Sequence, residues 1–163
     1  MTKRIFLTAI MMFAAAAAFA ATPVSLNGKL KVSGLQLVNE CGSPVQLRGV
    51  STHGLQWLWE CVNKDEALDF IANTMKADVL RIAMYVNEGG YLLNPALNIQ
   101  RVNQLVDEAG ERGMYAIIDW HILTPGNPNY NIEEARVFWT LMAQTHKGKK
   151  HVMYEICNEP NNV

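Results

Sequence analysis

The amino-acid sequence predicts an α/β fold: a (β/α)8 TIM barrel, incomplete here, with about the first four strands and three helices after an N-terminal hairpin. Strand-like runs alternate with helical stretches, which indicates a parallel sheet. The runs are almost continuously apolar, as expected for strands covered on both faces. They begin near Leu47, Val79, Tyr115 and Val152, at intervals of 32, 36 and 37 residues. Eight such units would need roughly 280 residues, close to the length of a typical barrel.

The first twenty residues predict a secretory signal peptide instead of a part of the fold. Lys3 and Arg4 precede an apolar stretch at 5–19, and small residues around Ala20 suit a signal peptidase. A membrane anchor is the alternative, but fifteen apolar residues fall short of the ~20 that span a bilayer. We therefore expect a secreted protein, free of the membrane after cleavage, whose residues 21–163 form the N-terminal part of the barrel.

Charge and cysteine content exclude some classes of partner. Removing Lys3 and Arg4 from the 14 basic residues leaves 12 against 15 acidic residues, a formal charge of −3. With no basic patch, nucleic acid is not an expected partner. The three cysteines, Cys41, Cys61 and Cys157, cannot all pair within the chain, and their spacing fits no zinc site. Pairing of Cys41 with Cys61 in an oxidising compartment stays open.

The hairpin is the first expected element. Residues 29–39 alternate apolar and polar side chains, residues 41–44 are typical of a turn, and residues 45–50 predict the second strand. Apolar residues at helical spacing then predict helices at 65–75, 99–112 and 132–145, the second of them ended by Gly113. The expected inward faces are Leu68, Ile71, Ala72 and Met75; Ile99, Val102, Leu105, Val106 and Ala109; and Ala135, Phe138, Trp139 and Met142. Predicted strands at 79–85, at 115–119 and from 152 lie between and after these helices.

Each predicted strand ends in residues that can do chemistry. They are His53 and Trp57; Arg81 and Tyr85; Asp119, Trp120 and His121; and Asn158 and Glu159. Pro160 cannot donate to a sheet and restricts the residue before it, so the last strand must stop there. A barrel gathers the carboxyl ends of its strands into one rim, where active sites form. Any single residue has an ordinary structural interpretation, such as a core aromatic or a buried ion pair, but their joint placement favours a site.

Glycosidic bond cleavage is the chemistry that these residues suggest. It needs a carboxylic acid that protonates the leaving oxygen and a second carboxylate on the other side of the sugar. Aromatic rings that can stack on pyranose rings are available in Trp57, Trp59, Tyr85 and Trp120. Asp119 is the only carboxylate besides Glu159 at a predicted strand end, whereas Glu155 lies on the strand itself and is expected to be structural, bonded within the barrel.

Other α/β enzymes fit the sequence less well. A doubly wound sheet would bring a Gly-x-Gly-x-x-Gly loop after the first strand, and residues 49–54 do not supply one. An esterase would show a Gly-x-Ser-x-Gly elbow, and an aldolase would place a lysine at a strand end. Neither feature is found in the sequence.

Four segments, at 47–57, 79–85, 116–121 and 154–160, resemble glycoside hydrolase family 5, and within it the bacterial endo-β-1,4-glucanases. They occur in the family's order and together span most of the chain after the signal. Asn-Glu-Pro alone is only moderately specific, because related barrel families share it. Leu58 departs from the family, whose members usually carry Tyr or Phe after the tryptophan.

The resemblance implies a retaining endo-β-1,4-glucanase with Glu159 as the general acid/base. Asn158 would contact the sugar 2-hydroxyl, Arg81 would orient the nucleophile, and His121 would belong to the active-site network. His53, Trp57 and Tyr85 would line the glycone subsites. The nucleophile would be a Glu of the seventh strand, roughly 100 residues beyond Glu159 and outside this chain. The resemblance further implies a bacterial, extracellular or periplasmic monomer that acts on β-glucan without metal or organic cofactor.

Two alternatives remain at this point. The same fold could act on mannan, lichenan or xyloglucan. The isolated chain could also be inactive, or bind glucan only weakly, because it lacks the nucleophile.

Overall fold

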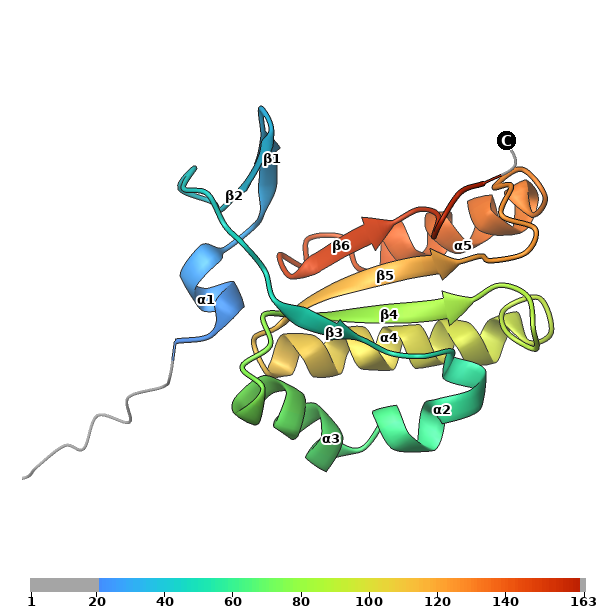
Figure 1. Ribbon diagram of the computed structural model, residues 1–163, viewed down its shortest axis with the longest axis horizontal. Helices are drawn as coiled ribbons and strands as arrows, with labels where there is room; N and C mark the ends of the chain where they lie inside the picture. Colours follow the sequence, from blue (N-terminus) through green and yellow to red (C-terminus); the bar gives the residue numbers. More distant parts are fainter. Residues whose placement is uncertain (1–20, 162–163) are drawn as a thin grey trace, which may run out of the picture.

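A four-stranded parallel sheet organises the protein, whose computed structural model describes residues 21–161 (Figure 1). Its strands are β3 (Gly49–Ser51), β4 (Val79–Tyr85), β5 (Tyr115–His121) and β6 (Val152–Glu155). They lie in the order β3-β4-β5-β6, so every strand pairs with the next one along the chain. Sequential parallel pairing is the arrangement of a barrel wall, whereas a doubly wound sheet reverses its order at a switch point.

Helices cover one face of this sheet (Figure 1). They are α2 (Leu55–Val62), α3 (Asp65–Asp69), α4 (Pro95–Glu111) and α5 (Ile132–Thr145), with α3 continued by the π-helix η1 (Phe70–Thr74). The core lies between sheet and helices, where Leu80, Ile82 and Met84 of β4 meet Ala116, Ile118 and Trp120 of β5 and the inward side chains of α4 and α5. Val102 and Phe138 are fully buried there.

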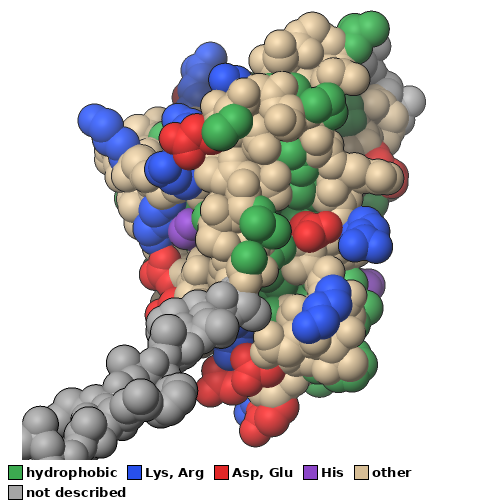
Figure 2. All heavy atoms as spheres, turned by 90° about the vertical axis from the view of Figure 1, so that its left-hand side faces the viewer, with side chains coloured by type: hydrophobic (Ala, Val, Ile, Leu, Met, Phe, Trp, Pro, Cys, Tyr) green, Lys and Arg blue, Asp and Glu red, His purple; other side chains and the backbone are tan. Residues whose placement is uncertain are grey.

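The amino-terminal segment lies beside the amino-terminal ends of the parallel strands (Figure 1). Helix α1 (Pro23–Asn27) begins with a capping box between Thr22 and Ser25. Strands β1 (Lys31–Ser33) and β2 (Gln36–Val38) follow as an antiparallel hairpin. The hydroxyl of Tyr115 donates to the carbonyl of Gly28 at 2.6 Å, which ties this segment to the start of β5. Seen from this end, acidic and basic side chains are interspersed with hydrophobic ones (Figure 2).

The hairpin differs from the sequence prediction. Both of its strands lie within 29–39, because Gly34, at φ 59°, allows a tight reversal between β1 and β2. Of residues 45–50, predicted as the partner strand, 45–48 form no strand and 49–50 begin β3, while the Val45 N–H donates to Leu37 O at 2.9 Å.

The helices also differ in detail. α4 begins four residues earlier than predicted, since Asn94 caps it by accepting from the Leu97 N–H at 3.1 Å and Pro95 occupies its first turn. The predicted helix at 65–75 is divided between α3 and η1, and the wider π turn leaves Met75 half-exposed instead of inward. α1 and α2 were not predicted, whereas α5 has the predicted bounds.

Residues alternate between the two faces of the sheet along β4 and β5. Even-numbered residues point toward the helices, and odd-numbered residues point to the opposite face. The register pairs Tyr85 with His121, and Asp119 with Glu155 on β6. The open face of the sheet is therefore polar near the carboxyl ends of its strands.

The predicted signal peptide, residues 1–20, lies outside the described residues. Within 21–161, none of the helices combines the length and the apolar character that crossing a bilayer requires.

Candidate active site

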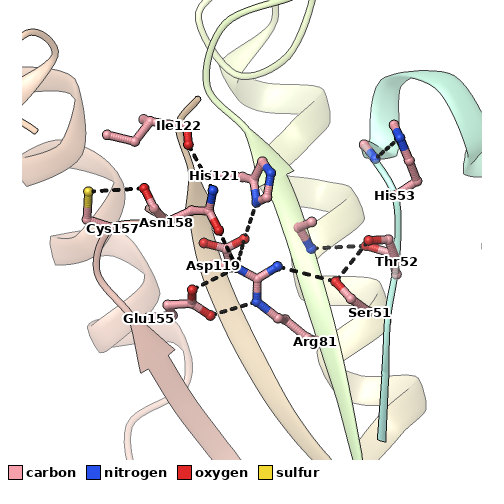
Figure 3. Close-up of polar contacts among 12 residues, drawn as sticks. Ser51, Thr52, His53, Arg81, Asp119, His121, Ile122, Glu155, Cys157 and Asn158 are labelled. Carbon is pink, nitrogen blue, oxygen red and sulfur yellow. Dashed lines mark hydrogen bonds and ion pairs between the residues drawn. The ribbon is translucent and has the colours of Figure 1, made fainter. Parts of the chain in front are cut away.

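Polar side chains gather around Arg81 on the open face of the sheet, and we call Arg81, Asp119, His121 and Asn158 the polar cluster (Figure 3). Its guanidinium pairs side-on with Glu155, with Nε 2.7 Å from Oε2 and Nη2 2.7 Å from Oε1. Nη2 also lies 2.9 Å from Oδ1 of Asn158 and 2.9 Å from Oδ2 of Asp119. The hydrogen bonds to Glu155 raise the pKa of Arg81, and the same bonds lower the pKa of Glu155. Both groups are therefore charged at neutral pH.

Within the polar cluster, Asp119 links Arg81 to His121. Its side chain is fully buried, and Oδ2 lies 2.6 Å from Nδ1 of His121. Burial raises the pKa of Asp119, while the hydrogen bond from His121 and the charge of Arg81 oppose that rise. In the tautomer that carries its proton on Nδ1, His121 donates to Asp119 Oδ2, and its Nε2 has no hydrogen-bond partner among residues 21–161.

A row of rings borders the cluster at the carboxyl ends of β3, β4 and β5. Tyr85 stacks on His121 with ring centroids 4.2 Å apart, and it stacks more loosely on His53 at 5.8 Å. Trp57, in the first turn of α2, meets the edge of Tyr85 at 5.0 Å and is 49% exposed. Together, His53, Trp57, Tyr85 and His121 form the aromatic row, which offers ring surface to solvent.

Asn158 is held in one orientation by three contacts. Its backbone N–H donates to Trp120 O at 3.1 Å, its Nδ2 donates to Ile122 O at 2.9 Å, and its Oδ1 accepts from Arg81. The side chain is almost buried. A carbonyl on one side and a guanidinium on the other define which way the amide faces. Nδ2 carries two N–H groups, and only one of them donates within residues 21–161, so the other remains for a further partner.

Glu159 is exposed, and its carboxylate makes no hydrogen bond or ion pair within the described part of the chain. Its φ is 38°, in the left-handed region, although the following Pro160 favours extended backbone. Asn161 supports this conformation, because its Nδ2 donates to Glu159 O at 2.9 Å and its N–H donates to Gly126 O at 3.0 Å. Backbone held in such a conformation by its surroundings is typical of functional sites.

The structure thus brings together Arg81, Asp119, His121 and Asn158, with the aromatic row beside them. Trp120, predicted to bind substrate, lies elsewhere: it is 2% exposed and packs against Tyr91 and Phe138, each with ring centroids 5.1 Å away. Asp119 and His121 point to the open face, so the residue between them must point to the helices. This alternation is visible in the sequence and already places Trp120 on the helix side of the sheet.

Trp59, the other aromatic residue predicted to be available for stacking on sugar, is partly buried, and its ring already contacts an arginine. The guanidinium of Arg101 lies 5.0 Å from its ring centroid, in a cation–π contact between α2 and α4.

Three residues that contact Arg81 were not predicted as site residues. Glu155 was expected to be structural, and it does form an ion pair within the sheet, but its partner is the central Arg81. Thr52 accepts the Ala83 N–H at 3.0 Å through Oγ1 and donates its own N–H to Arg81 O at 2.8 Å. Ser51 Oγ lies 3.4 Å from Nη1 of Arg81. Only the strand register reveals these contacts.

The cysteines take no part in the cluster. Cys41 and Cys61 are free and exposed, and burial raises the pKa of the half-buried Cys157. Among residues 21–161, no group of three or more His, Cys, Asp or Glu side chains is placed to hold a metal ion.

Comparison with known proteins identifies relatives of this arrangement. The model of the cellulase family, glycosyl hydrolase family 5, matches residues 38–163. Endoglucanase E-5 of Thermobifida fusca is 52% identical and endoglucanase CelA of Streptomyces lividans 54% identical, each over 87% of this chain. The chain spans 30% of the length of each of these two curated relatives.

Solved structures agree with the sequence relatives. The catalytic domain of the Thermobifida fusca endoglucanase Cel5A superposes with a TM-score of 0.85 at 52% identity, over 87% of this chain and 46% of that domain. The catalytic domain of alkaline cellulase K gives a TM-score of 0.79 at 36% identity, over 86% of this chain and 41% of that one. Such neighbours are TIM-barrel catalytic domains, and this chain matches a part of the barrel. The chain therefore belongs to glycosyl hydrolase family 5, the cellulase family.

Proposed function

We propose that the whole protein is an endo-β-1,4-glucanase that hydrolyses internal β-1,4-glucosidic bonds with retention of anomeric configuration. The observation that carries this proposal is the cluster of Arg81, Asp119, His121 and Asn158 on the open face, directly followed by the exposed Glu159. The relatives named endoglucanase support the substrate class. So does a solved complex of a variant Thermobifida fusca catalytic domain with cellotetraose.

In this proposal Glu159 is the general acid/base. In the first step its carboxyl proton passes to the departing glycosidic oxygen while a second carboxylate attacks the anomeric carbon. In the second step Glu159 takes a proton from water, and the resulting hydroxide releases the sugar from that carboxylate. Glu159 suits both steps because its carboxylate is exposed and is not engaged by Arg81 or another residue within 21–161. The second N–H of Asn158 Nδ2, the one that does not donate to Ile122 O, is available for a hydroxyl of the reacting sugar.

The second carboxylate belongs outside this chain in our proposal. Asp119 is fully buried against Arg81 and His121, and Glu155 is held side-on by Arg81. Neither is presented for attack on a sugar. The matched catalytic domains extend well beyond the part that this chain spans, so that remainder can supply the nucleophile.

The aromatic row is the proposed sugar-binding surface. Trp57 and Tyr85 offer ring faces and edges next to His53, and stacking of such rings on pyranose faces would place the chain of glucose units along the rim. Trp120, being buried, is not included.

Further parts of the proposal rest on sequence. We infer that residues 1–20 direct secretion, because Lys3 and Arg4 precede the apolar run at 5–19. Residues 21–163 would form the N-terminal part of the catalytic barrel in an extracellular or periplasmic bacterial enzyme, monomeric at full length. The chemistry described above uses side chains alone, without metal or organic cofactor.

The test is a comparison of initial rates of the purified full-length protein on carboxymethylcellulose, lichenan, mannan and xyloglucan. We expect carboxymethylcellulose to be cut internally, with a rapid fall in viscosity, and proton NMR of fresh products to show the β-anomer first. Residues 21–163 alone should not hydrolyse any of them. Preference for mannan or xyloglucan, or an initial α-anomer, would refute the corresponding part of the proposal.

A further inference from the structure

The donors of Arg81 are unevenly used. A guanidinium carries five N–H groups in a rigid planar fork. Nε and Nη2 together serve three acceptors: Glu155, Asn158 and Asp119. Within the described residues, Nη1 has a single polar contact, to Ser51 Oγ at 3.4 Å, which is long for a hydrogen bond. The Arg81 side chain is 23% exposed, so the guanidinium is still accessible from the open face.

Glu155 decides which edge of the fork is used. Its two oxygens pair with Nε and Nη2 at 2.7 Å each. Side-on pairing of this kind occupies one edge of the planar group and leaves Nη1 on the opposite edge. Asp119 and Asn158 bind only Nη2 and do not define the plane in the same way.

Charge balance alone does not account for Glu155. Asp119 already lies 2.9 Å from Nη2 and is fully buried, so it can neutralise Arg81 without help. Glu155 adds a second carboxylate to a single cation, and its pKa is lowered chiefly by its hydrogen bonds to Arg81. A second anion beside one cation is costly unless its geometry and hydrogen bonds offset that cost, and the two bonds of 2.7 Å to Nε and Nη2 are the contacts that do so for Glu155.

We propose that Glu155 is a positioning residue for the reaction: it holds the Arg81 guanidinium so that Nη1 is directed to a further carboxylate, the nucleophile supplied by the rest of the barrel. The inference rests on the proposed function, because it needs a second carboxylate at this site. Glu155 itself touches neither substrate nor nucleophile. It acts through Arg81, at the end of β6 and in register with Asp119.

A double-mutant cycle in the full-length protein tests this role. The variants are Glu155→Gln, Arg81→Ala and the combination, assayed on a soluble cello-oligosaccharide. We expect Glu155→Gln to lower kcat by about tenfold or more with KM changed less than about twofold, because a transition-state interaction is lost without ground-state binding. In the Arg81→Ala background the same change should alter kcat by less than about twofold. Glu134→Gln, an exposed acid of α5, is the matched control and should behave as wild type.

A second readout does not depend on activity. Nitrogen-15 relaxation of the Arg81 Nε–H group reports side-chain order, which should be high in the wild type and clearly lower in Glu155→Gln. If the wild type hydrolyses no polysaccharide, the proposed function fails, while this readout still shows whether Glu155 holds Arg81. An unchanged order of Arg81, or a loss of kcat just as large in the Arg81→Ala background, would overturn the positioning role.

Discussion

The Oδ2 atom of Asp119 lies 2.6 Å from Nδ1 of His121, two residues further along the same strand. Their side chains meet because alternate residues of β5 share one face of the sheet. The same oxygen lies 2.9 Å from Nη2 of Arg81 on the neighbouring strand. Asp119 therefore joins the imidazole and the guanidinium, and it orients both from a fully buried position.

Replacing Asp119 with Asn tests that link. The amide keeps the shape of the side chain but removes the anion that accepts from His121 and Arg81. We expect kcat of the full-length protein to fall at least about tenfold, and the free energy of unfolding to fall by about 1–3 kcal/mol, since buried partners lose a charged acceptor. Steady-state kinetics and urea denaturation measure the two effects. Asp107→Asn, on the exposed side of α4, is the control; equal behaviour of both variants would contradict the role of Asp119.

Thr52 offers a test of how β3 is attached to β4. Thr52→Val keeps the shape of the side chain but leaves the buried Ala83 N–H without its acceptor. The expected loss is about 1–3 kcal/mol of unfolding free energy. Thr52→Ser keeps the hydroxyl and should recover most of it. If Val and Ser destabilise the protein equally, the hydrogen bond is not what stabilises this junction.

Two tryptophans should respond oppositely to substitution. Trp57→Ala removes a half-exposed ring of the aromatic row, so we expect a cello-oligosaccharide to bind about tenfold more weakly while the melting temperature stays nearly constant. Trp120→Phe removes volume from the core between Tyr91 and Phe138, so we expect a lower melting temperature and an unchanged dissociation constant.

Calorimetric titration and thermal denaturation of both variants separate these outcomes. A weakened dissociation constant in Trp120→Phe, at unchanged stability, would return Trp120 to the sugar-binding surface.

His146 predicts a dependence of stability on pH. It is 2% exposed, its Nε2 lies 2.9 Å from Asn103 Oδ1, and its buried Nδ1 has no hydrogen-bond partner among residues 21–161. Burial, with help from the charge of Lys149 and from His151, lowers the pKa of His146 to about 4, while Asp107 acts in the opposite direction. The unfolded chain, with a histidine pKa near 6.5, takes up the proton first as the pH falls.

The contribution of neutral His146 to the free energy of unfolding is therefore complete above about pH 6.5. It is lost between that pH and about pH 4, by up to about 3 kcal/mol. Urea denaturation of the wild type and of His146→Gln across this range measures it. The difference between the two curves should change with pH; a constant difference would contradict a neutral, buried His146.

β4, β5 and α5 could be predicted from the sequence because the burial of these elements leaves a plain mark. β4 is a run of apolar residues broken only by Arg81, and α5 repeats its apolar residues at helical spacing. The strand ends predicted a common rim for Arg81, His121 and Asn158, and the structure places Arg81 against Asn158 and joins it to His121 through Asp119. The roles that the family resemblance gives these residues stay predictions.

Other features depend on information that local patterns do not carry. The π turn in η1 changes the face of Met75, and no periodicity indicates it. The ion pair of Glu155 on β6 with Arg81 on β4 reaches across β5, so it could not be foreseen without the register of the strands. Trp120 was misplaced because an aromatic residue at a strand end was read without regard to the alternation between Asp119 and His121.

The most direct test of the central claim is the Glu159→Gln variant of the full-length protein. Its turnover of carboxymethylcellulose and its affinity for cellotetraose should be measured in the same buffer. We predict that turnover falls by about 10²–10⁴-fold or more, because the proton donor is lost, while the dissociation constant changes less than about threefold. Near-normal turnover in Glu159→Gln would contradict the assignment of the general acid/base to this residue.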